Sequence, residues 1–357
     1  MLSPRRSVET IPAYHPPLAG RTGLRLDFNE NTAGSSPRVL RRLQQIGVEE
    51  LACYPERGSA EDAAAKFLGV DASELLLTNG VDEAIHLLCQ TYLEPNDEAI
   101  IVVPTYSMYR IYMMAAAAEV VSIPAGQDFS FPREELLSRL TPRTRMIAIA
   151  NPNNPTGSTV SREQLLEVAR AAPHAAVLMD EAYFEFYGHS VLAERRAAQN
   201  LFVARTFSKA YGLAGLRIGA LIGNAGQMQN VRRVCSPYNV NAVALACLPE
   251  AISDQEYIRQ YVAEVLDSRK RLERALDTAG VRRWPSQANF VLARIGSPGF
   301  VDCMKRRGIL VRDRSHDPGC EGCVRITVGT SAQTDRLLVA LQESLEEIGM
   351  AQGVAKP

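Results

Sequence analysis

The chain contains 357 residues, of which 46% are hydrophobic and 22% are charged, and its formal net charge is -1. A chain of this length is expected to fold as two packed domains or as one large and one small domain. The near balance of charges leaves no basic excess for neutralising a phosphate backbone, so nucleic acid is not an expected partner.

The first 30 residues are rich in proline and glycine and are predicted to form an extended N-terminal arm. They contain Arg5 and Arg6 but no apolar segment of the kind found in signal peptides. The chain has no run of about 18 apolar residues, so no membrane span is expected. Seven cysteines, an odd number, argue against a complete disulfide framework. We therefore expect a cytoplasmic protein with reduced thiols.

The next region, residues 31–240, alternates short apolar runs with amphipathic stretches and is predicted to form the large domain. The apolar runs predict strands at 99–103, 120–123, 146–150, 176–179, 201–204 and 218–222. Helical patterns lie between them at 106–117, 133–140 and 162–171, the last opened by a Ser161–Gln164 capping box. This alternation indicates βαβ units and a mostly parallel sheet, with a ligand site at the carboxyl ends of its strands.

The pattern changes beyond residue 240, where a long charged helix is predicted over 255–279. Shorter strands and helices follow, and a final helix is predicted over 333–348. Residues 241–357 are therefore expected to form a smaller α+β domain. Cys320 and Cys323 have the CxxC spacing of a zinc-ligand pair, but no second pair lies nearby, so no metal site is predicted.

Two predicted strands end in polar residues that suit a cofactor site. One runs into Asn-Pro-Asn-Asn-Pro-Thr-Gly (151–157), whose prolines and glycine fix a loop that presents the Asn154 carboxamide. Another is followed by Asp-Glu-Ala-Tyr (180–183). Because Asp180 follows apolar residues, its carboxylate is expected to be partly desolvated and to need a cationic partner. A protonated pyridine nitrogen would serve, and a structural ion pair is the alternative.

A third segment, residues 205–219, brings together a lysine, hydroxyl groups, an arginine and several glycines. A lysine in this setting can have a lowered pKa and act as an amine nucleophile, whereas the alternative for Lys209 is an ordinary surface lysine. The hydroxyls and Arg217 suit a phosphate. Upstream, the glycine of Thr-Asn-Gly-Val-Asp-Glu (78–83) precedes an apolar helix whose free N–H groups could hold that phosphate. Alternatively, the two acids there only complement the helix dipole.

In order and spacing, these segments resemble those of the fold-type I pyridoxal-phosphate enzymes, specifically the class I and II aminotransferases, and most closely the histidinol-phosphate aminotransferases. The third segment carries Ser-Lys-Ala-Tyr-Gly-Leu-Ala-Gly-Leu-Arg-Ile-Gly (208–219), and the resemblance extends from about Leu26 to Gly329. It implies an α/β fold in which a large domain, with a mostly parallel seven-stranded sheet between helices, joins a smaller α+β domain. It also implies pyridoxal 5'-phosphate as the cofactor.

The resemblance assigns roles around the cofactor ring. Lys209 would hold the cofactor as a Schiff base and then shuttle a proton between substrate and cofactor. Asp180 would pair with the pyridinium nitrogen. Asn154 and Tyr183 would hydrogen-bond the phenolic oxygen from two sides, and Tyr106 would stack on the ring.

The resemblance also implies a set of ligands for the cofactor phosphate. They are the backbone amides of Val81 and Asp82 and the side chains of Thr206, Ser208 and Arg217. Tyr54 would reach the phosphate bound by the neighbouring subunit, which implies a homodimer with shared active sites. The alternative for Tyr54 is a surface tyrosine in a loop.

Substrate contacts follow from the same resemblance. Arg325, on a predicted strand of the second domain, is expected to bind an α-carboxylate or an equivalent anion, with Asn29 close by. Arg312 resembles the arginine that meets the substrate phosphate in histidinol-phosphate enzymes, and Tyr14 would reach that phosphate from the other subunit. One departure weakens the match, because the usual Asn-Glu-Asn-Pro-Tyr-Gly is Asn-Glu-Asn-Thr-Ala-Gly here (29–34).

The implied activity is that of a histidinol-phosphate:2-oxoglutarate aminotransferase of histidine biosynthesis, with glutamate as the amino donor. An aromatic amino acid aminotransferase and a phospho-amino-acid (threonine-phosphate) decarboxylase share Lys209, Asp180 and the phosphate contacts, so both stay open. A cofactor-binding transcriptional regulator would need a separate DNA-binding domain, which an arm of about 20 residues cannot supply.

Overall fold

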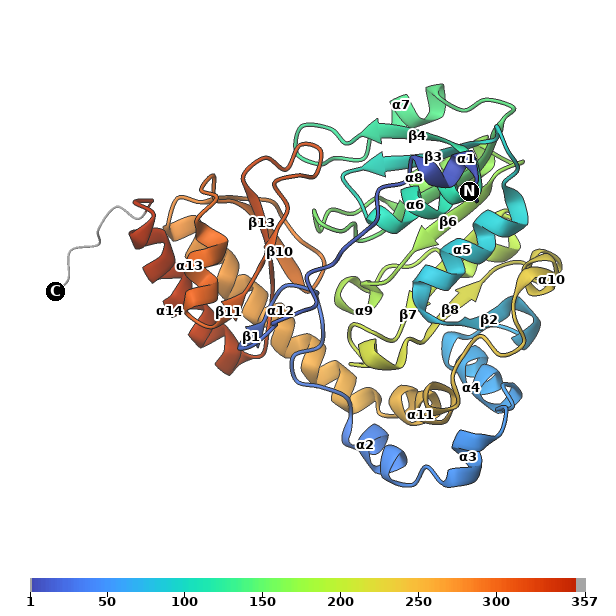
Figure 1. The fold of residues 1–357 in the computed structure, drawn as a ribbon, viewed down its shortest axis with the longest axis horizontal. Helices are drawn as coiled ribbons and strands as arrows, with labels where there is room; N and C mark the ends of the chain where they lie inside the picture. Colours follow the sequence, from blue (N-terminus) through green and yellow to red (C-terminus); the bar gives the residue numbers. More distant parts are fainter. Residues whose placement is uncertain (1, 351–357) are drawn as a thin grey trace.

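The computed structural model describes residues 2–350 and contains a seven-stranded and a four-stranded sheet, each covered by helices (Figure 1). The larger sheet has the order β2-β8-β7-β6-β5-β3-β4. Neighbours from β7 to β4 are parallel, and β8 is antiparallel to both β7 and β2. The strands are β2 (Leu75–Thr78), β3 (Glu98–Val103), β4 (Glu119–Pro124), β5 (Thr144–Ala150), β6 (Ala176–Asp180), β7 (Leu201–Thr206) and β8 (Gly219–Ile222).

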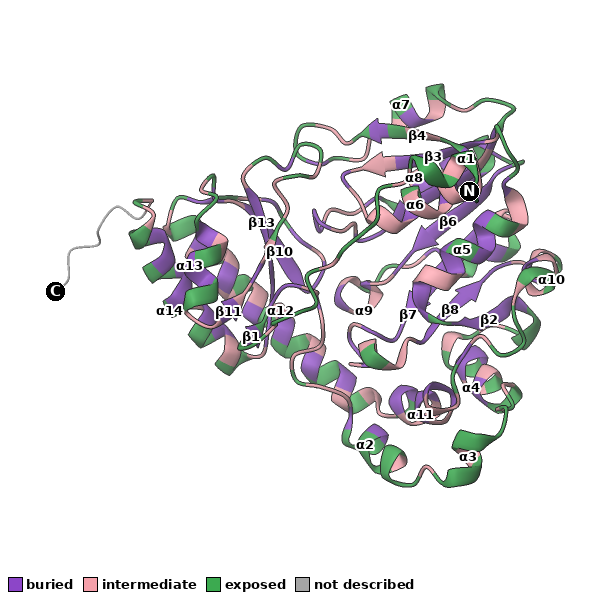
Figure 2. Ribbon diagram, viewed as in Figure 1, coloured by how far each residue is buried: buried purple, intermediate pink, exposed green. Residues whose placement is uncertain are grey.

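Side chains on these strands alternate between two helical layers, as a period of two requires. On β6, Leu178 packs with α5 (Gly80–Tyr92) and α6 (Ser107–Ala115), whereas Val177 faces α8 (Arg162–Ala171) on the other side. Burial on both faces explains why the central strands are continuously apolar in sequence. Figure 2 shows these strands buried and the outer helix faces exposed. The predicted capping box at the start of α8 is present.

The smaller sheet is antiparallel and has the order β12-β13-β10-β9. Its strands are β9 (Arg282–Arg283), β10 (Phe290–Arg294), β12 (Arg312–Asp313) and β13 (Cys323–Thr327). The helices α12 (Gln255–Thr278), α13 (Phe300–Arg306) and α14 (Ser331–Glu347) cover one face of it. The predicted long helices therefore occur within two residues of the expected ends.

One hydrophobic cluster joins the two sheets. Tyr183, next to the short helix α9 (Phe184–Tyr187), meets Phe290 of β10 edge-on, with 5.2 Å between ring centroids. Tyr261 of α12 packs in the same cluster. The packing of these rings fixes the small sheet over the carboxyl edge of the large one.

The N-terminal arm is less extended than predicted. Residues Arg6–Glu9 form the short helix α1, which lies against α6, and Arg5 donates a hydrogen bond to the Ala115 carbonyl. Residues Leu24–Arg25 form β1, which pairs with β11 (Ile309–Leu310) of the smaller unit. Between these anchors the chain crosses from the large sheet to the small one (Figure 1).

The remaining helices complete the large unit. The helix α11 (Ala242–Ser253) packs with α2 (Pro37–Gln44), α3 (Val48–Ala52) and α4 (Gly58–Leu68). The helix α10 (Ala225–Val234) contacts α5, and α7 (Arg133–Ser138) contacts α8. Short 3-10 helices occur at Ala72–Glu74, Leu192–Arg196 and Ala214–Leu216. Among residues 2–350, none of the helices combines the length and apolarity that a bilayer crossing needs.

Candidate active site

A cavity of about 630 Å³ opens at the carboxyl ends of β5, β6 and β7. The N-terminus of α5, the strands β12 and β13 and the arm close its other sides. Every predicted site residue except Tyr54 lines it: Tyr14, Asn29, Val81, Asp82, Tyr106, Asn154, Asp180, Tyr183, Thr206, Ser208, Lys209, Arg217, Arg312 and Arg325. Its place follows the rule that open parallel sheets bind ligands at the carboxyl ends of their strands.

Lys209 lies in the loop after β7, with its amine inside the cavity. The Nζ atom donates a hydrogen bond to the Phe28 carbonyl at 3.0 Å. Burial, followed by the positive charge of Arg325, lowers the pKa of Lys209 to about 8. A substantial neutral fraction near neutral pH makes this amine a competent nucleophile towards a carbonyl.

Asp180 is the last residue of β6 and is only 5% exposed. Its Oδ2 atom accepts a hydrogen bond from the Tyr109 hydroxyl at 2.5 Å, and its Oδ1 atom accepts one from the Ala182 amide at 3.0 Å. Burial still raises the pKa of Asp180 to about 6, because neither neighbour carries a positive charge. A cationic ring nitrogen would supply the charge that the carboxylate lacks.

Tyr109 was missing from the sequence prediction. It lies one helical turn after Tyr106, within the helix predicted at 106–117. The helical pattern gave no reason to assign Tyr109 to the site. Tyr106 itself lines the cavity and donates a hydrogen bond to Asp82 Oδ1 at 2.7 Å, with its ring edge-on to Tyr109. Its half-buried ring faces the cavity, and stacking on a cofactor ring there stays a prediction.

A cradle for an anion lies where β2 meets α5. Gly80 has a φ of +72°, and a Cβ atom there would collide with the Arg217 guanidinium. Arg217 pairs with Asp82 at 3.1 Å and has a left-handed φ of +54°. The Ser208 hydroxyl is buried and lacks a hydrogen-bond partner among residues 2–350. Free helix amides, a guanidinium and an unpartnered hydroxyl fit a phosphate group.

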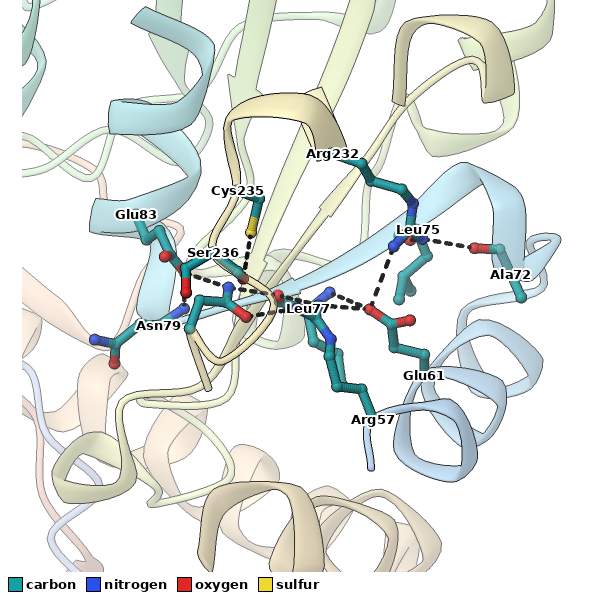
Figure 3. A network of polar contacts seen from close by, with 11 residues as sticks. Arg57, Glu61, Ala72, Leu75, Leu77, Asn79, Glu83, Arg232, Cys235 and Ser236 are labelled. Atoms are coloured by element: carbon teal, nitrogen blue, oxygen red, sulfur yellow. Dashed lines mark hydrogen bonds and ion pairs between the residues drawn. The ribbon is translucent and has the colours of Figure 1, made fainter. Parts of the chain in front are cut away.

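A polar network supports the junction of β2 and α5 on the side away from the cavity (Figure 3). Glu83 accepts hydrogen bonds from the Asn79 amide and from Asn239 Nδ2, both at 2.6 Å. Arg57 donates to Asn239 Oδ1 at 2.6 Å and to the Leu77 carbonyl at 3.0 Å. This network fixes the backbone that presents Val81 and Asp82 to the cradle.

Arg325 lies in the middle of β13 and is 5% exposed. It donates hydrogen bonds to Asn154 Oδ1 and to the Asp27 carbonyl, the second at 2.6 Å, while its buried Nε atom lacks a partner within residues 2–350. Burial lowers the pKa of Arg325 to about 10, so the group stays charged at neutral pH. A substrate anion would neutralise it.

Asn29 connects the two units at the floor of the cavity. Its φ of +56° is left-handed, a conformation that asparagine tolerates better than most residues. Asn29 Nδ2 donates to the Tyr183 hydroxyl at 2.9 Å, and its Oδ1 atom accepts from Thr327 at 2.8 Å. Asn29 therefore orients Tyr183, which is a contact that the sequence did not predict.

The two tyrosines predicted to act across a subunit interface lie in different places. Tyr14, expected to reach across from a partner subunit, lines the cavity of its own chain, because the arm folds back over that cavity. Tyr54 lies outside the cavity, is 77% exposed and stacks on Tyr238 with 4.2 Å between centroids. Arg314, which the sequence did not single out, joins Arg312 in the cavity wall.

The cysteine pair lies apart from this cavity. Cys320 and Cys323 are buried free thiols beside Trp284. Residues 2–350 contain no group of three or more His, Cys, Asp and Glu side chains arranged to hold a metal ion.

Comparison with known proteins gives concordant results. The sequence profile of the family described as Aminotransferase class I and II matches residues 21–341. A histidinol-phosphate aminotransferase of Geobacillus sp. is 34% identical over 356 residues, covering 96% of this chain and 95% of the relative.

Solved structures extend the comparison to the fold. A histidinol-phosphate aminotransferase of Sinorhizobium meliloti, in complex with pyridoxal-5'-phosphate, aligns with a TM-score of 0.88 at 25% identity, covering 97% of this chain and 98% of that one. An L-threonine-O-3-phosphate decarboxylase of Porphyromonas gingivalis aligns with a TM-score of 0.77, also at 25% identity, covering 90% and 99%. The predicted fold class is confirmed.

Proposed function

The chain belongs to the class I and II aminotransferases, which use pyridoxal phosphate, and within that family we propose that it transfers the amino group between histidinol phosphate and 2-oxoglutarate. One observation carries the choice of substrate: the cavity holds Arg312 in addition to Arg325. In histidinol phosphate the phosphate is separated from Cα by a methylene and an oxygen, so it extends beyond the position of an α-carboxylate. An anion of that length and charge needs a cation farther out than Arg325.

The cofactor-site residues support this chemistry. When bound, pyridoxal phosphate supplies a carbonyl that takes up the amino group and a ring that withdraws electrons from the substrate Cα. Asp180 would hold a proton on the ring nitrogen through an ion pair. Lys209 would release the bound cofactor to the substrate and, as a free amine, remove the proton from Cα. The lowered pKa of Lys209 favours the neutral amine that this step requires.

The substrate-binding residues would align the reacting bond. Arg325 would bind the substrate anion while it keeps its contact with Asn154, which comes from the large unit. Asn29 holds the Tyr183 hydroxyl from the opposite side. Because the contact between Arg325 and Asn154 joins the small sheet to the large unit, anion binding by Arg325 would also settle the small unit over the large one and exclude water from Lys209.

The departure at residues 29–34 falls on positions outside the cavity wall of this chain. Thr32 and Ala33, which replace the usual proline and tyrosine, do not line it. Asn31 Oδ1 accepts hydrogen bonds from the Ala33 and Gly34 amides and so supports the turn by itself. The substitution is therefore compatible with a phosphorylated substrate.

We also propose that the enzyme is a cytoplasmic homodimer. The face around α3 exposes Val48, Leu51, Tyr54 and Tyr238, with exposed fractions of 84%, 63%, 77% and 57%. An apolar patch of this kind is typical of a protein interface. A second copy would cover it and bring Tyr54 to the neighbouring phosphate cradle. The seven cysteines are all free thiols, which suits a reducing compartment.

The test is a titration of the cofactor-loaded protein, followed by the visible absorbance of the bound cofactor. Histidinol phosphate and glutamate should each discharge the absorbance, and 2-oxoglutarate should restore it. Phenylalanine and threonine phosphate serve as the alternative substrates. If phenylalanine discharges the absorbance and histidinol phosphate does not, the protein is an aromatic aminotransferase. Release of carbon dioxide from threonine phosphate would make it a decarboxylase.

A further inference from the structure

The loop between β12 and β13 is built from successive tight turns. The amide of Asp317 donates to the Arg314 carbonyl at 2.9 Å, that of Cys320 to the Asp317 carbonyl at 3.0 Å, and that of Cys323 to the Cys320 carbonyl at 2.8 Å. The Arg314 amide donates to the Cys323 carbonyl at 2.9 Å and closes the loop. With both ends tied to the sheet, the backbone of Arg314 has little freedom.

An apolar plug anchors the same loop. Cys320 and Cys323 are fully buried in a cluster with Trp284, Leu292 and Phe129. Phe129 belongs to the large unit and its ring packs on Trp284, with 4.9 Å between centroids. The CxxC spacing therefore has a packing role here, and it holds the loop against the cavity edge.

The Arg314 side chain points into the cavity from this rigid base. It is a wall residue with only 11% of the side chain exposed, and it forms an ion pair with Asp317. Its Nε atom is buried and has no hydrogen-bond partner among residues 2–350. A buried donor without a partner is costly unless a ligand satisfies it.

The charge of this side of the cavity is strongly unbalanced. Within the described part of the smaller unit, the residues that line the cavity are Arg312, Arg314 and Arg325, and no acidic side chain lines it beside them. The positive charges of Arg314 and Arg312 both contribute to lowering the pKa of Arg325, after its burial. Among the described residues, Asp317 is the single carboxylate paired with any of the three. A singly charged anion would leave this repulsion largely in place, whereas a dianion would relieve it.

We propose that Arg314 is a specificity-determining residue that binds the second negative charge of a phosphate monoester. Asp317 is the positioning residue, which keeps the guanidinium paired when a singly charged group occupies the site. This inference rests on the proposed function, since the phosphate of histidinol phosphate carries two negative charges on one group, whereas each carboxylate of glutamate carries one. It explains how one cavity can accept both partners of the reaction.

The test compares Arg314→Gln and Arg314→Lys with a matched control, Arg294→Gln. Arg294 donates to the Gly319 carbonyl of the same loop and lies outside the cavity wall. For Arg314→Gln, we expect kcat/KM for histidinol phosphate to fall about tenfold to a hundredfold, the range for a lost charged hydrogen bond. The glutamate half-reaction should change by less than about threefold. Arg314→Lys should recover part of the loss, and Arg294→Gln should match the wild type.

Inorganic phosphate gives a readout that does not depend on histidinol phosphate being the substrate. As an inhibitor of the glutamate half-reaction of the holoenzyme, phosphate should bind more tightly as pH rises and it becomes a dianion. Arg314→Gln should remove that pH dependence. Equal losses for glutamate and histidinol phosphate, or phosphate inhibition that is absent or independent of Arg314, would overturn the proposal. Wild-type inactivity on histidinol phosphate with phosphate inhibition retained would overturn the proposed function alone.

Discussion

The hydroxyl of Tyr109 lies 2.5 Å from Oδ2 of Asp180 and donates a hydrogen bond to it. Tyr109 is fully buried between the sheet and α6, and it is the side-chain donor to the carboxylate that faces the cavity. The contact makes a core tyrosine part of the cofactor site, because the hydrogen bond favours the charged form of Asp180 against the effect of burial.

Replacement of Tyr109 by phenylalanine should therefore raise the pKa of Asp180 above about 6 in the cofactor-free chain. The cost of losing a hydrogen bond to a charged group is about 1.5–3 kcal/mol, so cofactor affinity should fall roughly tenfold to a hundredfold. The dissociation constant of pyridoxal phosphate, measured across pH, checks this. Tyr112→Phe is the control, because Tyr112 stacks on His86 outside the cavity. Equal effects of both variants would contradict the assignment.

Asp180→Asn should separate stability from activity. Burial raises the folded-state pKa of Asp180 from 3.8 to about 6, so its charge destabilises the cofactor-free fold above pH 6, and stability rises as pH falls through 6. At pH 8 the neutral amide should raise the free energy of unfolding by on the order of 1–3 kcal/mol. Activity should fall at least a hundredfold, because the ring nitrogen loses its ionic partner. Denaturant unfolding at pH 5 and pH 8 checks the sign, and a gain at pH 5 equal to that at pH 8 would refute it.

The lysine makes the opposite prediction. Its folded-state pKa of about 8 lies below the ordinary 10.5, so the cofactor-free fold gains stability as pH rises between these two values. The rate of cofactor attachment should increase with pH and level off above about 8, as the neutral amine becomes the main form. Arg325→Gln should move this profile to higher pH, because Arg325 is the largest electrostatic cause of the shift. Stopped-flow absorbance of cofactor binding measures this pH profile. A profile that is the same in Arg325→Gln and in the wild type would show that Arg325 does not lower the pKa of Lys209.

Gly80→Ala tests the phosphate cradle. The added Cβ would collide with the Arg217 guanidinium, at a φ of +72° that alanine rarely adopts. We expect cofactor affinity to fall at least tenfold and stability by about 1–3 kcal/mol. Gly69→Ala is matched for backbone strain, since its φ is +67° and a Cβ there meets nothing within 4 Å. Both variants should lose stability, but only Gly80→Ala should lose affinity for the cofactor. A similar loss of cofactor affinity in Gly69→Ala would contradict the assignment of the phosphate cradle.

The proposed sharing of active sites can be tested by mixing two inactive variants. Lys209→Ala and Tyr54→Ala subunits, unfolded together and refolded, should form mixed dimers that contain one intact site. Random pairing restores about a quarter of the wild-type sites. No recovery of activity from the two inactive variants would show that Tyr54 acts within its own chain, and an active Tyr54→Ala protein would show that Tyr54 has no part in the site.

Tyr14 supplies the contrasting case. Tyr14 lines the cavity of its own chain. The activity of a refolded mixture of Lys209→Ala and Tyr14→Phe subunits should therefore equal the activity of the Tyr14→Phe subunits that it contains. Recovery like that expected for Tyr54 would place Tyr14 across the interface instead.

The amino-acid sequence was enough to predict the alternation of strands and helices in the large unit and the polar segments at the ends of its central strands. Apolar runs and capping residues are local signals that can be read from short stretches of sequence. Asn154, Asp180 and Lys209 are polar residues that follow shortly after such apolar runs. Because parallel strands share one carboxyl edge, this local order was enough to predict that those side chains meet. The capping box at Ser161 formed for the same reason, since its partners are three residues apart.

The contacts that join distant segments could be seen only in the folded chain. Tyr109 looked like an ordinary core residue until the packing of α6 placed its hydroxyl on Asp180. The fold-back of Tyr14 depends on β1 pairing with β11, whose residues lie almost 300 positions away. Arg314 gained its direction from a chain of turns and a plug that includes Phe129 of the large unit. Such contacts are set by burial and pairing between remote parts of the chain, which leave no periodic trace in the sequence around either partner.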